Sequence, residues 1–184
     1  METREIEKQF NSWDDVLYPE LRATIRGTYY GVISQEQMDE ECFYIAQRAV
    51  SAFKFPRIST EYEVVHYVRS EEDPSVFMEV DEDDDNFDDS IPHAYFLNKL
   101  THDEIEVIVA WMKVYWCEYQ LSSADNFEDM YTDANIKTYS RANMVDKNLK
   151  LLKEYREYAR DLENRYSRVT SVRKPSLGDV NSDE

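Results

Sequence analysis

Residues 101–117 have the sequence THDEIEVIVAWMKVYWC, and this stretch decides the fold. Thr101 and Glu104 have the spacing of a capping box, in which each side chain accepts a hydrogen bond from an N–H group at the start of a helix. From Ile105 onward, apolar residues occupy nearly every side of the predicted helix. A helix that is apolar all round is buried on most sides. We therefore expect this helix at the centre of the fold, enclosed either by the rest of the chain or by a neighbouring subunit.

Helical spacing of apolar residues also appears on both sides of this stretch. A short helix is predicted within residues 3–17, and Pro19 suits the first turn of a second one. A capping box at Ser34 precedes a predicted helix over 35–53. A long helix is predicted from about Tyr139 to Val169, with a heptad-like seam. The seam consists of Val145, Leu149, Leu152, Arg156, Ala159, Leu162 and Tyr166.

The apolar period changes to two at residues 62–68, which predicts a strand, and 76–80 is a second short candidate. The two would form a β-hairpin. Between Glu71 and Ser90 there are eleven Asp or Glu and no Lys or Arg, which predicts an exposed mobile loop. A calcium-binding EF-hand is excluded, because Asn86 and Pro92 stand where that loop needs Gly and Glu.

These patterns together predict a mainly α fold. We expect a helical bundle with one long C-terminal helix and a small β-hairpin insertion. Residues 1–169 would form a single domain with the acidic loop at about 71–90, and 170–184 a flexible C-terminal tail, since Pro175, Gly178 and a polar end follow the last helix.

Composition excludes several function classes. The net charge of −18 disfavours proteins that wrap nucleic acid or bind anionic membranes. Three glycines are too few for a P-loop or a dinucleotide-binding turn. Cys42 and Cys117 fall within apolar stretches, which predicts buried thiols in a reducing compartment. No secretion signal and no membrane-spanning segment is indicated.

No catalytic or metal-binding motif stands out in the sequence. His66, His93 and His102 are expected in a strand, a loop and a helix start, and their spacing matches no zinc motif. Acidic pairs are numerous only because the chain is acidic. We therefore expect no enzymatic activity, no metal and no cofactor. Trp111 and Trp116 have an apolar setting, which favours core or interface packing over a ligand box.

Charge is distributed unevenly along the chain. Residues 1–140 contain 11 basic and 31 acidic residues, a net −20, whereas residues 141–184 contain 10 and 8, a net +2. An acidic body with a basic-ended helix is electrically self-complementary between copies, so subunit docking would use this asymmetry. The interface candidates are Trp111, Trp116, Leu149, Leu152, Arg160, Arg165, Arg168, Arg173 and Lys174.

Two stretches carry a resemblance to a known family: LTHDEIEVIVAWMKVYW (100–116) and YTDANIKTYSRANMVDKNLKLLKEYREYAR (131–160). Their order is an apolar helix containing Trp, a Tyr-Thr-Asp…Tyr-Ser-Arg-Ala-Asn segment and a long Leu-rich charged helix. Together with the preceding FKFP (53–56), the pattern resembles small virion proteins of tailed bacteriophages that lie in the neck, between portal and tail. The resemblance covers about residues 34–169.

The resemblance implies a head–tail connector, or adaptor, subunit. Such proteins are mostly helical, form rings (often dodecamers) below the portal, contact portal and other neck or tail proteins, and catalyse no reaction. It also implies assembly in the host cytoplasm and a final position in the virion, with DNA passing through the ring channel without specific binding. The alternative is an acidic DNA-mimic or inhibitor protein that binds a host nucleic-acid enzyme, which the acidic 71–90 segment favours.

Overall fold

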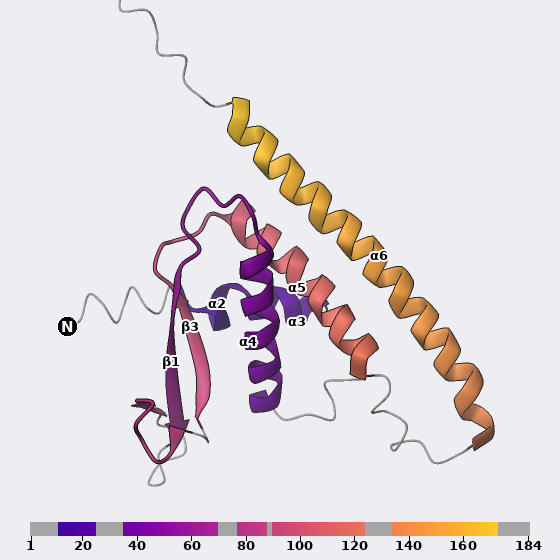
Figure 1. Cartoon of the computed structure of the whole chain (residues 1–184), viewed down its shortest axis with the longest axis horizontal. Coiled ribbons are helices and arrows are strands. Elements are labelled where there is room, and N and C mark those ends of the chain that lie inside the picture. Colours follow the sequence, from indigo (N-terminus) through magenta and orange to yellow (C-terminus); the bar gives the residue numbers. More distant parts are fainter. Residues whose placement is uncertain (1–10, 25–34, 70–76, 88–89, 124–133, 173–184) are drawn as a thin grey trace, which may run out of the picture.

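A computed structural model of the chain describes residues 11–24, 35–69, 77–87, 90–123 and 134–172. The fold is mainly α-helical with a small antiparallel sheet (Figure 1). The elements, in chain order, are α2 (Trp13–Val16), α3 (Tyr18–Thr24), α4 (Gln35–Ala52), β1 (Tyr62–Arg69), β2 (Phe77–Val80), β3 (Ile91–Phe96), α5 (His102–Ser123) and α6 (Ala134–Val172).

The sheet contains the predicted hairpin and one further strand. Its order is β2-β1-β3, and β1 pairs antiparallel with both neighbours, with Val65 opposite His93 in β3. The strand β3 was not predicted from the sequence, and His93 was expected in a loop. That placement is wrong, and its physical cause is composition: IPHAYF contains a Pro and no clear apolar–polar alternation.

In the described residues, the helix predicted within 3–17 does not include residues 11–12. The expected helix over 3–17 begins only at Trp13, because Ser12 is its N-cap and its hydroxyl accepts a hydrogen bond from the Asp14 N–H at 3.2 Å. Ser12 also bridges to Tyr95, and the Phe96 N–H donates to the Asn11 carbonyl at 3.1 Å. Residues 11–12 therefore extend the sheet instead of the helix, and the predicted part before residue 11 lies outside the described residues.

The central helix α5 is enclosed by its own chain. It packs against α3, α4 and α6. Val107, Ile108 and Met112 are buried in the main core, which also holds Trp13. The ring centroids of Phe43, Tyr62 and Phe96 lie 5.8, 4.7 and 5.4 Å from that of Trp13. The sequence left open whether α5 is enclosed by the rest of its own chain or by a neighbouring subunit. In the structure, the rest of the chain encloses it.

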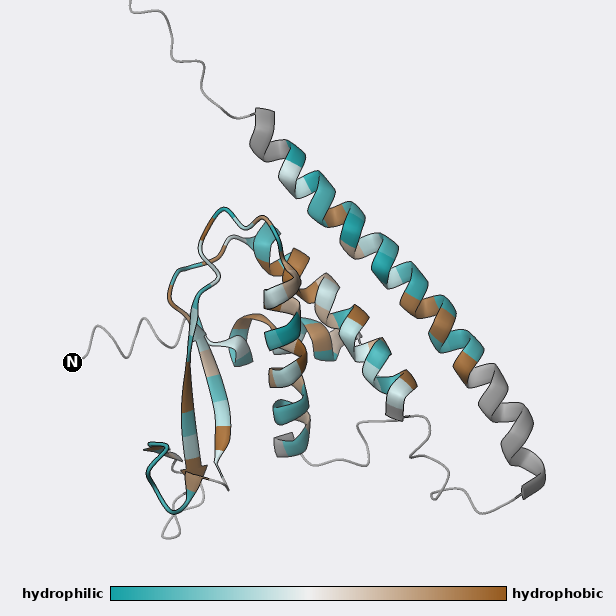
Figure 2. Ribbon diagram, in the orientation of Figure 1, coloured by the Kyte–Doolittle hydropathy of each residue, from teal (hydrophilic) through white to brown (hydrophobic). Residues whose placement is uncertain are grey.

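The helix α6 packs along α5 through a second apolar cluster. Ala110, Val114 and Cys117 of α5 meet Leu152 and Ala159 of α6 there. Small residues at Ala110 and Ala159 let the two helices approach closely. Figure 2 shows the contrast: α5 is largely apolar, whereas α6 is mostly hydrophilic with scattered apolar positions.

The start of α5 is fixed as the sequence predicts. The Thr101 N–H and hydroxyl donate to a Glu104 carboxylate oxygen at 2.9 and 2.7 Å, and the Glu104 N–H donates back to the Thr101 hydroxyl at 3.4 Å. This is the predicted capping box, and the helix begins at His102. The predicted helix over 35–53 is likewise confirmed as α4, although its proposed cap at Ser34 lies outside the described residues.

Candidate assembly interface

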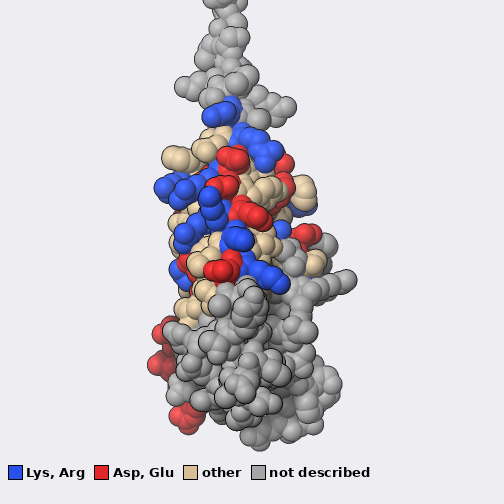
Figure 3. Space-filling view, turned by 90° about the vertical axis from the view of Figure 1, so that its right-hand side faces the viewer, with Lys and Arg blue, Asp and Glu red and all other residues tan. Residues whose placement is uncertain are grey.

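One narrow side of the helix α6 packs against the rest of the protein, and the opposite side faces solvent. Leu152, Ala159 and Tyr166 are buried on the inner side. Figure 3 looks onto the outer side, where Lys and Arg side chains outnumber the Asp and Glu between them. The exposed basic residues of α6 are Lys147, Lys150, Lys153, Arg156, Arg160, Arg165 and Arg168. The outer side of α6 is therefore a basic surface on an acidic protein.

The predicted interface residues on α6 separate into two groups. Arg160, Arg165 and Arg168 are exposed, and the Leu149 side chain is 50% exposed. Leu152 is only 8% exposed and packs against α5, so it belongs to the intrachain core and offers no surface to a second chain. The other two candidates, Arg173 and Lys174, lie outside the described residues.

The two predicted tryptophans of α5 are partly buried. Trp111 and Trp116 pack against both apolar clusters. The indole Nε1 of each is buried without a hydrogen-bond partner among the described residues. Both rings are thus used mainly for packing within the chain, and Trp111 also lines a groove at the surface.

This groove lies between the end of α4, the middle of α5 and the C-terminal half of α6. It is open to solvent, has a volume of about 540 Å³ and is lined in part by the aromatic rings of Phe55, Trp111 and Tyr115. Lys54 and Arg160 stand at its walls. Phe55 is 64% exposed, an unusual degree for a Phe side chain in a described segment. We call this site the aromatic–basic groove.

The segment that carries Lys54 and Phe55 is held in place by carboxylates of α5 and α6. The Lys54 N–H donates to Glu163 Oε1 at 2.9 Å. The N–H groups of Arg57 and Ile58 donate to Glu104 Oε1 at 3.1 and 2.9 Å. These bonds fix the backbone on both sides of Phe55, so its ring is held at the surface by the fold.

Glu104 is the centre of this arrangement. Its carboxylate is fully buried and also accepts a hydrogen bond from the Tyr166 hydroxyl at 2.7 Å. Burial by itself would raise its pKa, but the donors at Thr101, Tyr166 and Ile58 outweigh burial and lower the pKa from 4.5 to about 2. The capping-box pattern located Glu104, but no signal in the sequence pointed to its bonds with the 57–58 segment or with Tyr166.

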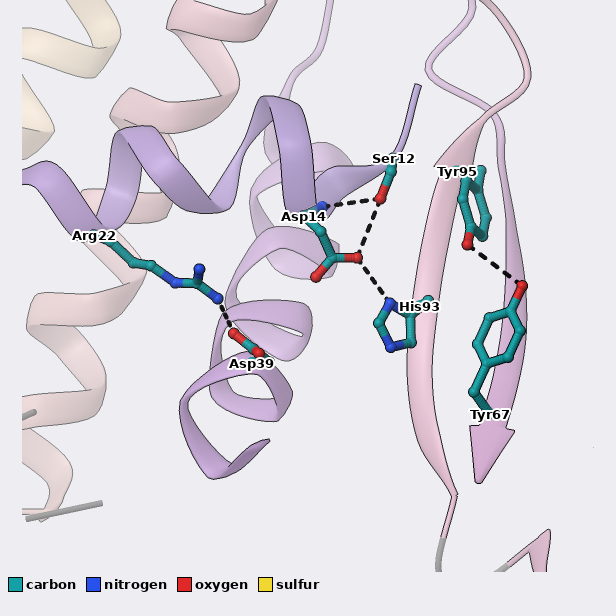
Figure 4. A network of polar contacts seen from close by, with 7 residues as sticks. All are labelled: Ser12, Asp14, Arg22, Asp39, Tyr67, His93 and Tyr95. Carbon is teal, nitrogen blue, oxygen red and sulfur yellow. Dashed lines mark hydrogen bonds and ion pairs between the residues drawn. The ribbon is translucent and has the colours of Figure 1, made fainter. Parts of the chain in front are cut away.

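A second polar network fastens α2 to the sheet (Figure 4). Asp14 Oδ2 lies 2.8 Å from His93 Nδ1, and the Tyr95 and Tyr67 hydroxyls lie 3.4 Å apart beside them. Burial would raise the pKa of Asp14, but its hydrogen bond and attraction to His93 lower it overall. Arg22 of α3 pairs with Asp39 of α4 in the same region. These contacts tie α2, α3, α4 and the sheet together.

An acidic turn follows the strand β2. Asp81, Glu82, Asp83, Asp84 and Asp85 follow β2, and all are exposed. The Asp84 carboxylate and carbonyl accept hydrogen bonds from the N–H groups of Asn86 at 2.9 Å and Phe87 at 3.0 Å. The Phe87 ring lies 4.4 Å from the His66 ring, which anchors the turn to β1. We call residues 81–85 the acidic turn.

The two thiols of the chain are buried. Burial raises the pKa of the Cys42 thiol to about 11 and that of Cys117 to about 12, so both are protonated and weakly nucleophilic at neutral pH. Within the described part of the chain, no group of three or more His, Cys, Asp or Glu could hold a metal ion. In the same part, no helix is long and apolar enough to cross a membrane.

Comparisons with known proteins found no relative of this chain. No protein-family model matches the chain, and neither does any curated protein or solved structure.

Proposed function

We propose that this chain is a structural subunit of a bacteriophage virion, a head–tail connector or adaptor that assembles as a ring in the neck between portal and tail. Its helices would form a bundle in which α6 serves as the long arm that reaches a neighbour. The subunit would be made in the host cytoplasm, carry no cofactor and catalyse no reaction.

One observation carries the proposal: an exposed acidic turn and a groove with two exposed cations, Lys54 and Arg160, lie far apart on the molecule. The acidic turn lies at the lower end of the sheet in Figure 1, and the aromatic–basic groove lies near the upper ends of α4 and α6. A subunit with separated complementary patches favours head-to-tail contacts, which generate rings when the rotation between copies closes. The resemblance of residues 100–116 and 131–160 to neck proteins supports the same function.

The net charge fits the role of a channel wall. A strongly acidic surface repels a DNA duplex, so DNA would pass through a ring of these subunits without binding specifically. An assembled ring with a basic lumen would contradict this part of the proposal.

The test is the mass of the purified protein by light scattering, alone and with the portal protein of the same virus. The proposal predicts one closed oligomer of defined copy number, formed alone or on the portal. A protein that stays monomeric or dimeric under both conditions would contradict it.

The second candidate, an acidic inhibitor of a nucleic-acid enzyme, is favoured by the exposed acidic turn. Such a protein presents carboxylates to a basic groove in place of phosphates. It predicts a monomer or dimer that blocks DNA binding by a nuclease or polymerase, whereas the connector predicts no such inhibition.

A further inference from the structure

The aromatic–basic groove has the chemistry of a docking site for an acidic segment. Phe55, Trp111 and Tyr115 provide an aromatic part of the lining. Lys54 and Arg160 provide two cations whose side chains form no ion pair with other described residues. Neighbouring Arg48 holds its guanidinium 4.3 Å from the Tyr115 ring and pairs with Glu118 at 3.2 Å, so its charge is already matched within the chain. The Glu163 carboxylate also lines the groove, but it is buried and accepts the Lys54 N–H. The cations of Lys54 and Arg160 beside the exposed Phe55 ring favour a partner that brings carboxylates.

The protein itself offers such a segment. The acidic turn exposes five consecutive carboxylates, and Asp83 and Asp85 accept no hydrogen bond from other described residues. A phosphate polymer is a poor competitor for the groove, because the net charge of −18 repels nucleic acid at long range.

The turn and the groove of one chain cannot meet each other. Figure 1 places the turn after β2 at the lower end of the sheet, and the end of α4 near the top of the molecule. Hydrogen bonds fix both sites: Glu163 and Glu104 hold the groove segment, and Asp84 holds the turn. The groove must therefore be filled from another molecule.

We propose that the aromatic–basic groove of one copy receives the acidic turn, Asp81–Asp85, of a second copy. This deepens and rests on the proposed function, since it names the two surfaces that join neighbouring subunits. The contact is heterologous: each copy uses its groove toward one neighbour and its turn toward the other, so repetition leads to a ring or an open filament. The Lys54 and Arg160 charges pair with the carboxylates, and the contact weakens as salt screens them.

Paired charge reversals test this contact. The groove variant is K54E/R160E, and the turn variant is D83K/D85K, which leaves the bonds of Asp84 intact. Each variant alone places like charges face to face, and we expect its self-association to be weaker by about tenfold or more. An equimolar mixture of the two restores association, because each acidic groove now meets a basic turn and each basic groove an acidic turn.

Matched variants control for net charge. K147E/K150E changes two exposed cations on the same helix away from the groove, and E61K/E63K changes two exposed carboxylates at the start of β1, Glu61 just before the strand and Glu63 within it. Both should associate as the wild type does. Melting temperatures check that each variant folds. If K54E/R160E does not fold, R160E alone takes its place, because it leaves the 54–58 segment unaltered.

The measurement is light scattering at about 0.05 M and about 0.5 M salt, where the screening length differs severalfold. Restored association in the mixture, at low salt, supports the proposal. Wild-type association that neither reversal weakens, or a mixture that stays dissociated, overturns the docking contact while the connector function stands. A wild type that does not associate with itself at low salt also overturns the contact, and its assembly on a portal then decides the proposed function separately.

Discussion

The two longest helices of the protein use their residues in opposite ways. The 22-residue helix α5 buries or half-buries most of its described side chains and packs against α3, α4 and α6. The 39-residue helix α6 buries only a narrow line within its described side chains and exposes a basic surface. The more apolar helix, α5, therefore buries its apolar surface within the chain. The more polar helix, α6, leaves exposed surface that a partner can contact.

The largest expected effect comes from placing a charge on each helix in turn. Ile108 of α5 is 0% exposed, so Ile108→Asp buries an unpaired carboxylate and should lower the free energy of unfolding by about 4 kcal/mol or more. The control, Leu149→Asp on α6, should change it by no more than about 0.5 kcal/mol. Urea denaturation followed by circular dichroism measures both, and similar losses for the two variants would remove the distinction between the helices.

The second effect concerns the carboxylate that joins both helices. Glu104→Gln keeps the shape of the side chain but replaces one acceptor oxygen with an amide that faces N–H donors. It should cost about 1–3 kcal/mol of stability. Glu106→Gln is the control, because Glu106 is exposed and receives only the Tyr158 hydroxyl, at 3.1 Å, among the described residues. Equal destabilisation by both variants would mean that the Glu104 hydrogen bonds contribute nothing.

Lowering the pH tests the contribution of the Glu104 carboxylate more sharply. The pKa of Glu104 is about 2 in the folded protein and near its ordinary 4.5 when the chain is unfolded. Its charged form therefore stabilises the fold fully above pH 4.5, and this contribution is lost as the pH falls through about 2. The stability difference between wild type and Glu104→Gln should shrink over that range. Urea titrations at several pH values measure it, and a constant difference would contradict the pKa.

The smallest effect is on thiol reactivity. Cys117 is buried between α5 and α6 and its pKa is raised to about 12, so a thiol reagent should modify it only when the chain opens. A Leu149→Cys variant places a thiol on the exposed side of α6, where labelling should be rapid. Rapid modification of Cys117 in the native protein would show that the two helices separate easily.

The sequence predicted the elements with strong local signals. The capping box at Thr101 and Glu104 located the start of α5, and the apolar stripe over 35–53 located α4. It missed β3, because Pro92 and His93 interrupt the pattern of a strand, and it extended α2 too far, because Ser12 joins the sheet. Local spacing cannot reveal that Glu104 also holds residues 57–58, which are distant in sequence.

The candidate interface was predicted only in part. The basic end of α6 follows directly from the charge distribution along the chain. The heptad-like seam of α6 placed Leu149 and Leu152 together, but only Leu149 faces solvent, because the inner side of the helix is narrower than the seam. The groove at Phe55 depends on backbone bonds from three elements, so no single stretch of sequence contains it.

The most direct test of the central claim, that this chain works by joining copies of itself, is electron microscopy of the concentrated protein, alone and mixed with its portal. The account predicts closed rings of uniform size, in which the acidic turn of each copy touches α6 and the Phe55 segment of the next. Separate single chains in both samples would contradict it.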